Sequence, residues 1–437
     1  MPRNRYSHGG LARNGSVTGH DRDRLVLSAV VFTVLFGQVL LYPGVPDLVA
    51  ALGATPAGWG GDVDAILEAG KWFLTAEFVG FVLFAGVWGA LSDATGHRRR
   101  FVVVGALGGA VGYLVLPLVA SVATLPYGAV LLVRFLQGAA TIGAFSLAIT
   151  TLMDLGGGHG RNMGAAGIAI GLGTALGAPI GGQLYAVGSF VPLYVASAML
   201  VVAATLAATV PDRTTASDRD GLIAALDGVR SRPVLGLPYA LGFIDRLTAG
   251  FFALVGTVFF QSAFPVGAAG SGILLGAFFA PFALLQYPMG RLSDRVGRVA
   301  PVAVGSLAYG LAVIAVLLTA PSVVLAALAM AVVGVFGATM APATMALVTD
   351  LSAPDQRGAA MGGFNVVGSL GFLAGIVGGA TVAARYGFEA AFLVVGLSEV
   401  VIAVVALPVL LRLDLGSAGG ADRRTPEEGA EPRAEEA

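Results

Sequence analysis

Three charged side chains interrupt long apolar stretches of this 437-residue chain: Glu77, Arg134 and Glu399. On insertion scales a charge at the centre of a membrane costs roughly 2.5–3.5 kcal/mol, so such residues are usually functional. Counted at 1.5 Å per residue, Glu77 lies about 24 Å along its helix from Asp93, and Arg134 lies about 30 Å from Asp154. Arginine reach and helix tilt can close that difference. We therefore expect Glu77 and Arg134 to face each other.

A carboxylate beside a guanidinium in a low dielectric stays charged until it is protonated or its partner is displaced. The pair is therefore a candidate for proton coupling. The alternatives are a static salt bridge, or side chains near enough to the outer surface to be solvated. Glu399 lies near the middle of the last apolar stretch, where we expect a structural or lipid-boundary residue that Ser398 or a neighbouring helix satisfies. A proton or partner site is the alternative for Glu399.

The sequence lacks the residues and motifs needed for catalysis, metal binding, disulfide formation or ATP hydrolysis. All four histidines lie outside the apolar stretches and the chain has no cysteine, which excludes a histidine relay within the membrane, a disulfide and a thiolate metal site. The chain has no Gly-x-Ser-x-Gly, His-Glu-x-x-His or Gly-x-x-x-x-Gly-Lys-Ser/Thr motif. We therefore expect no catalytic residues, no metal site, no cofactor, no use of ATP and no nucleic-acid partner.

The elements that hold these residues are predicted to be membrane-spanning helices. Hydrophobic residues make up 56% of the chain and charged residues 12%. Stretches of about 20 apolar residues, enough to cross ~30 Å of hydrocarbon, follow one another almost without pause. We predict an all-α integral membrane protein with twelve transmembrane helices, at residues 25–42, 72–91, 101–120, 127–153, 163–187, 190–210, 247–264, 271–292, 299–318, 322–348, 358–384 and 388–411.

The basic residues predict the topology. With both termini cytoplasmic, all of the 25 Lys and Arg residues except Lys71, Arg134 and Arg385 fall on the inner side. An odd number of spans would break this bias. Residues 1–24 lack the apolar core of a cleaved signal peptide. We predict that they and the acidic segment 413–437 are disordered cytoplasmic tails, on a multi-pass protein of the cell membrane.

The chain repeats itself at half its length. Gly89-Ala-Leu-Ser-Asp93 returns as Gly290-Arg-Leu-Ser-Asp294 after 201 residues. Further matches run in register through six spans: Asp154 with Asp350, Gly138 with Gly334, and Gly173, Gly177 and Gly181 with Gly371, Gly375 and Gly379. We predict two pseudo-symmetric six-helix bundles, at 25–210 and 245–412. They are joined by a cytoplasmic loop at 211–244 that contains a short amphipathic helix at 221–229.

The three charges within the spans do not belong to this repeat. In the other half, the positions that correspond to Glu77, Arg134 and Glu399 hold apolar residues, which are Phe278, Met330 and Val201. The charges are therefore additions to a scaffold that both halves share.

Both copies of the repeated pattern resemble the cytoplasmic signature loop of the major facilitator superfamily of secondary transporters, Gly-x-Leu-x-Asp-Arg-x-Gly-Arg-Arg. In the first copy Ala94 and His97 replace two of the usual arginines. The resemblance implies a loop that latches an inner gate and rearranges during alternating access. A basic loop that only fixes topology is the simpler alternative. The residues concerned are Gly89, Asp93, Gly96, Arg98, Gly290, Asp294, Arg295, Gly297 and Arg298.

Two further motifs resemble one branch of this superfamily, the twelve-span drug/proton antiporters. Arg134 begins Arg-Phe-Leu-Gln-Gly, which is similar to the Arg-x-x-Gln-Gly motif of proton-coupled members. The fifth predicted span is similar to the Gly/Pro motif of exporters. Without that resemblance it reads as a surface for close helix packing. Its residues are Gly173, Gly177, Pro179, Gly181 and Gly182.

The resemblance also implies that spans 1, 4, 7 and 10 line a central cavity. The candidates for its lining are polar, aromatic and methionine side chains in these spans and a neighbouring one: Gln38, Gln137, Phe252, Phe259, Met340 and Asn365. Such a weakly charged lining suits a hydrophobic or amphiphilic substrate, although aromatic side chains in a span also face lipid.

These expectations together describe a secondary transporter that works as a monomer in the lipid bilayer. It is expected to export a hydrophobic or amphiphilic small molecule in exchange for protons. The first alternative is an uptake symporter or facilitator for a small metabolite. The second is a transporter-like protein that serves as a receptor or lipid scramblase.

Overall fold

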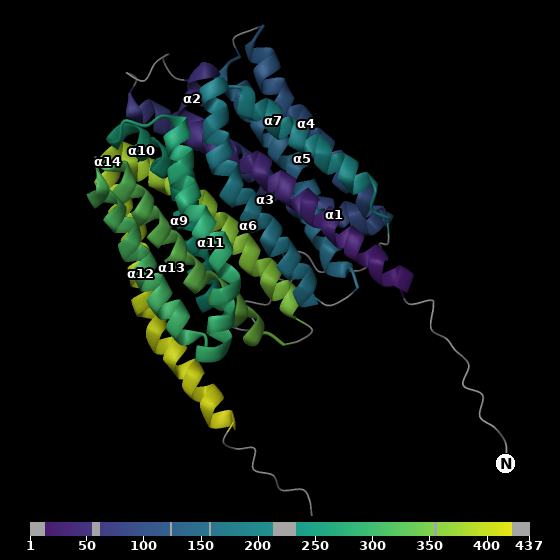
Figure 1. Cartoon of the computed structure of the whole chain (residues 1–437), viewed down its shortest axis with the longest axis vertical. Helices are drawn as coiled ribbons and strands as arrows, with labels where there is room; N and C mark the ends of the chain where they lie inside the picture. The colour runs from purple at the N-terminus through teal and green to yellow at the C-terminus, as the bar shows by residue number, and fades with distance from the viewer. Residues whose placement is uncertain are drawn as a thin grey trace, which may run out of the picture.

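The computed structural model describes residues 14–54, 62–122, 125–156, 159–212, 233–353 and 356–421. Within these ranges the chain forms helices joined by short connections, without β-strands. Two groups of roughly parallel helices lie side by side in Figure 1, one purple to teal and the other green to yellow. The predicted all-α fold is therefore confirmed.

The first group contains the helices of the N-terminal half. In chain order these are α1 (Asn14–Val39), the 3-10 helix η1 (Tyr42–Gly44), α2 (Val45–Ala51), α3 (Val63–Thr95), α4 (Arg98–Ala120), α5 (Tyr127–Asp154), α6 (His159–Val187) and α7 (Val191–Ala208).

The second group contains the helices of the C-terminal half. In chain order these are η2 (Pro233–Leu235), α9 (Gly236–Phe251), the π-helical segment η3 (Phe252–Gly256), α10 (Thr257–Ala263), α11 (Ala268–Val296), α12 (Val299–Ala315), η4 (Val316–Thr319), α13 (Val323–Asp350) and α14 (Arg357–Ala421).

The predicted number of spans agrees with these helices. Among the described residues, 11 helices are long and apolar enough to cross a membrane, and the last of them covers the 53 residues Ala360–Arg412. That segment contains two helices, because Gly387 has a non-helical backbone with φ of 83°. Counted separately, they bring the total to the predicted twelve, six in each half.

The helices extend beyond the predicted domain boundaries. Helix α1 begins at Asn14, so residues 14–24 are helical rather than part of a disordered tail. The second bundle begins at Pro233 rather than at residue 245, and α14 continues to Ala421. A helix does not stop where the apolar stretch stops, because its backbone hydrogen bonds continue into the polar turns. The predicted helix at 221–229 and the tail segments 1–13 and 422–437 lie outside the described residues.

The N-terminal part of α1 shows how such polar turns are held. Arg24 is 6% exposed; its Nε donates to Asn162 Oδ1 at 2.7 Å and its Nη2 to the backbone oxygen of Gly156 at 3.1 Å. These bonds tie α1 to α6 and to the connection between α5 and α6.

Glycines allow close helix crossings at corresponding positions in the two halves. A Cβ atom at Gly138 on α5 would overlap the backbone oxygen of Glu77 on α3. In the second half, a Cβ atom at Gly334 on α13 would overlap the backbone oxygen of Phe278 on α11. Each glycine therefore lets two helix backbones touch. Because the same contact recurs at corresponding positions, the internal repeat predicted from the sequence is confirmed as two pseudo-symmetric bundles.

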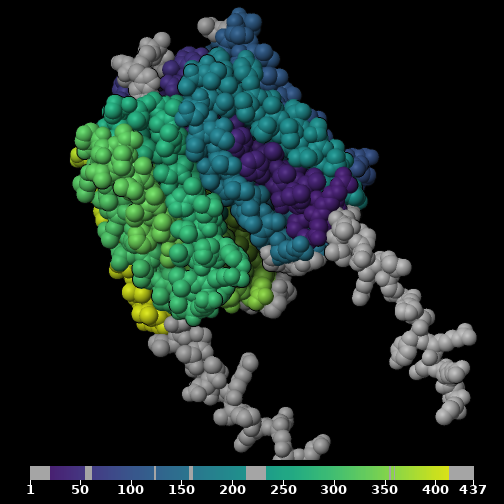
Figure 2. All heavy atoms as spheres, in the orientation of Figure 1, coloured from purple at the N-terminus to yellow at the C-terminus, as the bar shows by residue number. Residues whose placement is uncertain are grey.

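The two halves meet along α6 with α11 and along α3 with α14. Gly182 on α6 lies directly against Gly272 on α11, and the rings of Phe78 and Phe372 stack with centroids 4.5 Å apart. In Figure 2 the two halves touch each other in the upper part of the view. There Gln261 Nε2, on α10, donates to the backbone oxygen of Pro43 at 2.6 Å. The end that carries α2 and α10 is therefore closed.

Candidate functional site

Glu77 and Arg134 form an ion pair inside the N-terminal bundle. Both side chains are fully buried, and Arg134 Nη2 donates to Glu77 Oε2. Arg134 Nη1 donates to Gln137 Oε1 at 2.5 Å, while Gln137 Nε2 lies 3.3 Å from Glu77 Oε1. Tyr113 Oη donates to the same carboxylate oxygen at 3.3 Å. The sequence-predicted residues Glu77, Arg134 and Gln137 are thus brought together, with Tyr113 as a fourth member that the sequence did not single out.

Aromatic rings close the site around the guanidinium. Arg134 Cζ lies 4.4 Å from the ring centroid of Phe73 and 5.6 Å from that of Tyr113. Such cation–π contacts reach about 2 kcal/mol when they are desolvated. Arg134 Nε is the exception, since it has no hydrogen-bond partner among the described residues. The site therefore holds one positive and one negative charge, shielded from solvent.

The helix crossing explains why these two side chains meet. Gly138 follows Arg134 by one turn of α5, and Gly80 follows Glu77 by three residues of α3. A Cβ atom at Gly80 would overlap the backbone oxygen of Phe135, as one at Gly138 would overlap that of Glu77. Because residues three and four apart share a helix face, the close crossing puts both charges at the contact.

The second half builds the same crossing without charge. Phe278 and Met330 occupy the positions that correspond to Glu77 and Arg134, and they are 1% and 0% exposed. An apolar pair therefore satisfies the packing of this crossing. Packing of this crossing therefore does not by itself require the ion pair of the first half.

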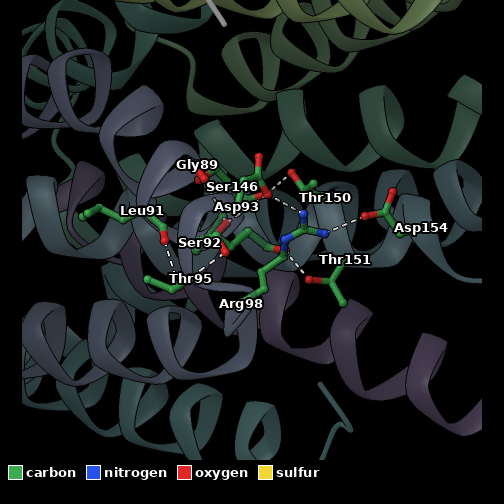
Figure 3. Close-up of polar contacts among 11 residues, drawn as sticks. Gly89, Leu91, Ser92, Asp93, Thr95, Arg98, Ser146, Thr150, Thr151 and Asp154 are labelled. Atoms are coloured by element: carbon green, nitrogen blue, oxygen red, sulfur yellow. Dashed lines mark hydrogen bonds and ion pairs between the residues drawn. The ribbon is translucent and has the colours of Figure 1, made fainter. Parts of the chain in front are cut away.

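The first signature loop is organised around Arg98, where the C-terminal ends of α3 and α5 meet the N-terminal end of α4 (Figure 3). Arg98 Nη2 donates to Asp93 Oδ1 at 2.8 Å, and Nη1 donates to Asp154 Oδ2 at 2.5 Å. The arginine is 3% exposed. Gly96 ends α3 with φ of 67°, a conformation that glycine adopts without strain. One cation thus joins three helix ends.

The second signature loop repeats this arrangement around Arg298. Its Nη1 lies 2.6 Å from Asp294 Oδ1 and 3.1 Å from Ser293 Oγ, and its Nε lies 3.0 Å from Asp350 Oδ2. Partial burial lowers the pKa of Arg298, but the hydrogen bonds to the two aspartates outweigh this and raise it. Arg295, the other predicted cation of this loop, is exposed.

The remaining predicted loop glycines lie where little surrounds them. Gly297 ends α11 with φ of 86°. A Cβ atom at Gly89 would meet nothing within 4 Å, and one at Gly290 would lie 3.7 Å from Pro342 Cβ. In this structure Gly89 and Gly290 therefore do not support a close helix contact.

Asp154 and Asp350 are functional candidates that the sequence reasoning missed. Their match at an offset of 196 residues marked the repeat, but it did not link them to the signature loops. Two repeated features could have revealed the pairing. An aspartate recurs at the C-terminal ends of spans 4 and 10, and an arginine recurs in each signature loop as a possible partner.

The difference in burial between the two loops leads to a prediction. Arg98→Ala should lower the free energy of unfolding by about 3 kcal/mol, because it leaves carboxylates in a partly buried place without their cation. Arg298→Ala should lower it by at most about 1 kcal/mol, since that pairing is exposed to solvent. Thermal unfolding in detergent measures both, with exposed Arg99→Ala as the control. Equal losses for Arg98 and Arg298 would contradict the prediction.

The Gly/Pro segment of α6 has two faces with different neighbours. Gly173, Gly177 and Gly181 face α1, where added Cβ atoms would crowd Leu35, Val39 and Leu40 in turn. Gly182 and Pro179 face α11 instead, against Gly272 and Gly276. One face of α6 thus packs within its own half, and the other forms part of the boundary between the halves.

The predicted cavity-lining residues are mostly buried in this structure. Phe252 and Phe259 belong to a cluster of phenylalanine rings around Phe392, with centroids 6.0 and 4.8 Å from it. Met340 is 0% exposed and packs against Gly305 of α12.

The polar candidates for the cavity are placed differently from one another. Gln38 is buried, and its Nε2 has no partner among the described residues. Gln137 belongs to the ion-pair site. Asn365 on α14 is exposed, so it is the one of the six candidates whose side chain is open to its surroundings.

Glu399 does not lie at the lipid boundary, so that part of the expectation was wrong; it is satisfied by neighbouring helices, which was the other part. It is 0% exposed and accepts hydrogen bonds from Thr248 Oγ1 at 3.2 Å and Ser306 Oγ at 3.1 Å. Ser398 points elsewhere, donating to the backbone oxygen of Val394. The error arose because α14 packs against α9 and α12, which no count along the sequence revealed.

Among the described residues, no three His, Cys, Asp or Glu side chains gather as metal ligands do. The fold and the site together define a class: a membrane protein of two six-helix repeats with paired signature loops and a buried ion pair. A family model described as "Major Facilitator Superfamily" matches residues 27–268 and 238–435. The chain belongs to this superfamily of transporters.

Solved structures agree on the fold. The nucleoside transporter NupG superposes with a TM-score of 0.69 at 15% identity, covering 89% of this chain and 98% of NupG. A bacterial homologue of the human lysosomal transporter Spinster, inward-facing and unoccupied, gives 0.69 at 14% identity, covering 94% and 99%. The human organic anion transporter MFSD10 (TETRAN) gives 0.64 at 20% identity, covering 88% and 98%.

No curated protein matches the sequence. At these identities the solved structures show the fold alone. The comparisons therefore support membership of the superfamily and a general role in transport. They do not support the drug/proton antiporter branch that the motifs suggested, since the neighbours named here are nucleoside, organic anion and Spinster-type transporters.

Proposed function

We propose that this protein is a proton-coupled secondary transporter, in which Glu77 binds the coupling proton and Arg134 is its counter-ion. The observation that carries the proposal is the fully buried Glu77–Arg134 pair, which Tyr113 and Gln137 complete. In the other half, the apolar residues Phe278 and Met330 fill the corresponding buried positions. Packing at this crossing can therefore be achieved without a charged pair.

The pair has the properties of a two-state switch. While the carboxylate is charged, the guanidinium neutralises it, and the site is stable as a unit. A proton on Glu77 removes the attraction and leaves Arg134 without a counter-charge, which is costly in a buried site. Protonation therefore favours a conformation in which Arg134 reaches water or an anionic group, so proton binding and conformational change are linked.

The rest of the fold supplies parts for alternating access. Arg98 and Arg298 hold the inner helix ends of their own halves together, so that each half moves as a body. The boundary at Gly182 and Gly272 is built from small residues, which lets α6 and α11 approach and separate. In the proposed cycle the closed end at α2 and α10 opens outward as the signature loops come together.

For the substrate, we favour export of a hydrophobic or amphiphilic small molecule by a monomer in the cell membrane, with both chain termini in the cytoplasm. The support is the motif around Arg134 and the scarcity of other charges in the described spans that would bind a strongly ionic compound. Uptake of a small metabolite is the second candidate, favoured by the similarity in fold to a nucleoside transporter.

Proton flux in proteoliposomes tests the proposal. With a pH-sensitive dye inside, adding substrate should move protons in the wild type, and Glu77→Gln should abolish that movement. Lipophilic cations and neutral drugs are screened first and nucleosides second, so that the class of active compound decides between export and uptake. Glu68→Gln is the matched control, because Glu68 lies on the same helix but is exposed and paired with Lys71.

Two outcomes would count against the proposal. Unchanged substrate-driven proton movement in Glu77→Gln would remove Glu77 from coupling. One-sided accessibility of the chain under all conditions, without any flux, would instead favour a receptor or scramblase role.

A further inference from the structure

A second buried carboxyl group lies in the C-terminal bundle, away from the Glu77–Arg134 pair. Glu399 on α14 faces α9 and α12, whose hydroxyl groups contact one carboxyl oxygen each: Thr248 Oγ1 contacts Oε1 at 3.2 Å and Ser306 Oγ contacts Oε2 at 3.1 Å. Glu399, Thr248 and Ser306 are all 0% exposed. The group is therefore held from both sides in a closed position.

The backbone is shaped to admit this side chain. A Cβ atom at Gly310 on α12 would overlap the backbone oxygen of Gly396 and lie 2.8 Å from Glu399 Cβ. In the first half the corresponding glycine, Gly109, faces Thr141 and Leu200, where an added Cβ atom would overlap Thr141 Oγ1 and lie 2.8 Å from Leu200 Cδ1. Leu200, rather than the exposed Val201 that the sequence alignment suggested, is thus the spatial counterpart of Glu399.

The surroundings of Glu399 contain no partner of opposite charge among the described residues. Asp245 lies one turn before Thr248 on the same face of α9 and is 7% exposed. Arg246 lies near Asp245, with Nε 4.0 Å from its carboxylate, but its side chain is 44% exposed. Both acids on this face of the bundle therefore share a site that lacks a buried cation.

One more polar group is directed into the same place. Tyr309 on α12 is 0% exposed, and its Oη has no hydrogen-bond partner of good geometry among the described residues. It follows Ser306 by three residues on α12, so the two side chains share a helix face. A tyrosine hydroxyl group is uncharged, so it offers no cation that could offset a carboxylate in this place.

We propose that Glu399 is a second proton-binding site, enclosed by Thr248, Ser306 and Tyr309 and connected to water through Asp245. A carboxylate here, fully buried and beside another acid, carries a large desolvation cost that no cation offsets. A neutral carboxylic acid avoids that cost. The O–H bond forms on a carboxylate oxygen of Glu399 with a proton that comes from water, and Asp245, which keeps some exposure, is its entry point.

The position of the site connects it with the movement of α9. Thr248 lies four residues before the π-helical segment Phe252–Gly256, and π-helical turns are frequent at functional sites. Loss of the proton puts a charge against α9 next to this turn, which favours a conformation that hydrates the site. The C-terminal half thus takes up a proton of its own, independently of Glu77.

Infrared spectroscopy of the purified full-length protein in detergent tests the proposal directly. Near neutral pH the wild type should show the carbonyl stretch of a buried, protonated carboxyl group. Glu399→Gln should lack it, and Glu389→Gln, which changes an exposed carboxyl on the same helix, should retain it. A Glu399→Gln spectrum that keeps the whole wild-type band would overturn the proposal. Glu77→Gln should leave the band in place, so this result is separate from the fate of the coupling proposal.

A second pair of variants decides the question if Glu399→Gln does not fold. Thr248→Val removes one hydroxyl contact and should shift the carbonyl band to higher frequency, because the carbonyl loses a hydrogen bond. Thr248→Ser keeps the hydroxyl and should leave the band unchanged. The same band position in both variants, or no band in either, would show that Glu399 is not the protonated group.

The pH dependence of stability gives an independent measurement. A proton that is bound in the folded state and released on unfolding makes the wild type less stable as pH rises through neutrality. Each such proton changes the unfolding equilibrium by about tenfold per pH unit. Glu399→Gln should remove that dependence, whereas Glu389→Gln should keep it. Equal slopes for wild type and Glu399→Gln would contradict proton binding at this site.

Discussion

Arg134→Met is expected to lower the free energy of unfolding by about 3–5 kcal/mol, because it leaves Glu77 as a buried carboxylate without a cation. Tyr113 and Gln137 still donate hydrogen bonds to that carboxylate, but hydrogen bonds to a buried charge offset only part of its desolvation. Thermal unfolding of the purified protein in detergent measures the loss, and proton flux in proteoliposomes should disappear.

The second half of the chain shows how the stability can be restored. Phe278 and Met330 fill the corresponding crossing, so the double variant Glu77→Phe with Arg134→Met recreates an arrangement that this fold already packs. Replacing a buried ion pair by apolar residues is often neutral or stabilising. We therefore expect the double variant to unfold near the wild-type temperature while proton coupling remains abolished. This separates the role in coupling from any role in stability.

An additive result would contradict this account. If the two substitutions together destabilise by the sum of their separate effects, the carboxylate and the guanidinium do not depend on each other. Coupling that survives in the stable double variant would place the proton site elsewhere.

The second large effect is expected at the boundary between the halves. Gly182→Leu puts a side chain where α6 touches Gly272 of α11, and it should weaken the closed arrangement of the end that carries α2 and α10. Overpacking of this kind costs about 1–3 kcal/mol, which shifts a conformational equilibrium by roughly 5- to 150-fold. Transport should be lost, since the cycle needs both arrangements.

Thiol labelling measures this shift without background, because the chain has no cysteine. A cysteine introduced by Gln261→Cys, on the closed side next to Pro43, should react with a membrane-impermeant reagent faster in the Gly182→Leu variant. Gly167→Leu is the matched control, since Gly167 lies on the same helix with open space around it. Equal labelling in the two variants would mean that α6 and α11 do not hold this end closed.

The sequence was most informative where the chain repeats or where a residue type is rare. The repeated loops predicted two bundles and their inner ends, and the scarcity of charges within the spans singled out Glu77, Arg134 and Glu399. The helical rise predicted the depths of Glu77 and Arg134 well enough to pair them. The same arithmetic did not place Tyr113, because a tyrosine in an apolar stretch gives no sign of whether it faces lipid or a buried carboxylate.

Predictions of what a side chain faces were less successful. Phe252 and Phe259 were expected to line a cavity, and they lie in a ring cluster with Phe392. In a transmembrane helix every face is apolar, so the hydrophobic pattern that distinguishes core from surface in a soluble protein is missing. Burial in such a helix depends on which helices are its neighbours.

The sequence by itself determined the class of this protein. Twelve apolar spans, a repeat in register and the distribution of basic residues follow from local composition, and local composition alone decides whether a helix enters a membrane. The tertiary structure decided how the charges are used. In the structure Asp154 and Asp350 are the partners of Arg98 and Arg298, and Glu399 is enclosed. The sequence did not reveal these contacts, because they join residues about fifty or more positions apart. Helix crossings at single glycines bring them together.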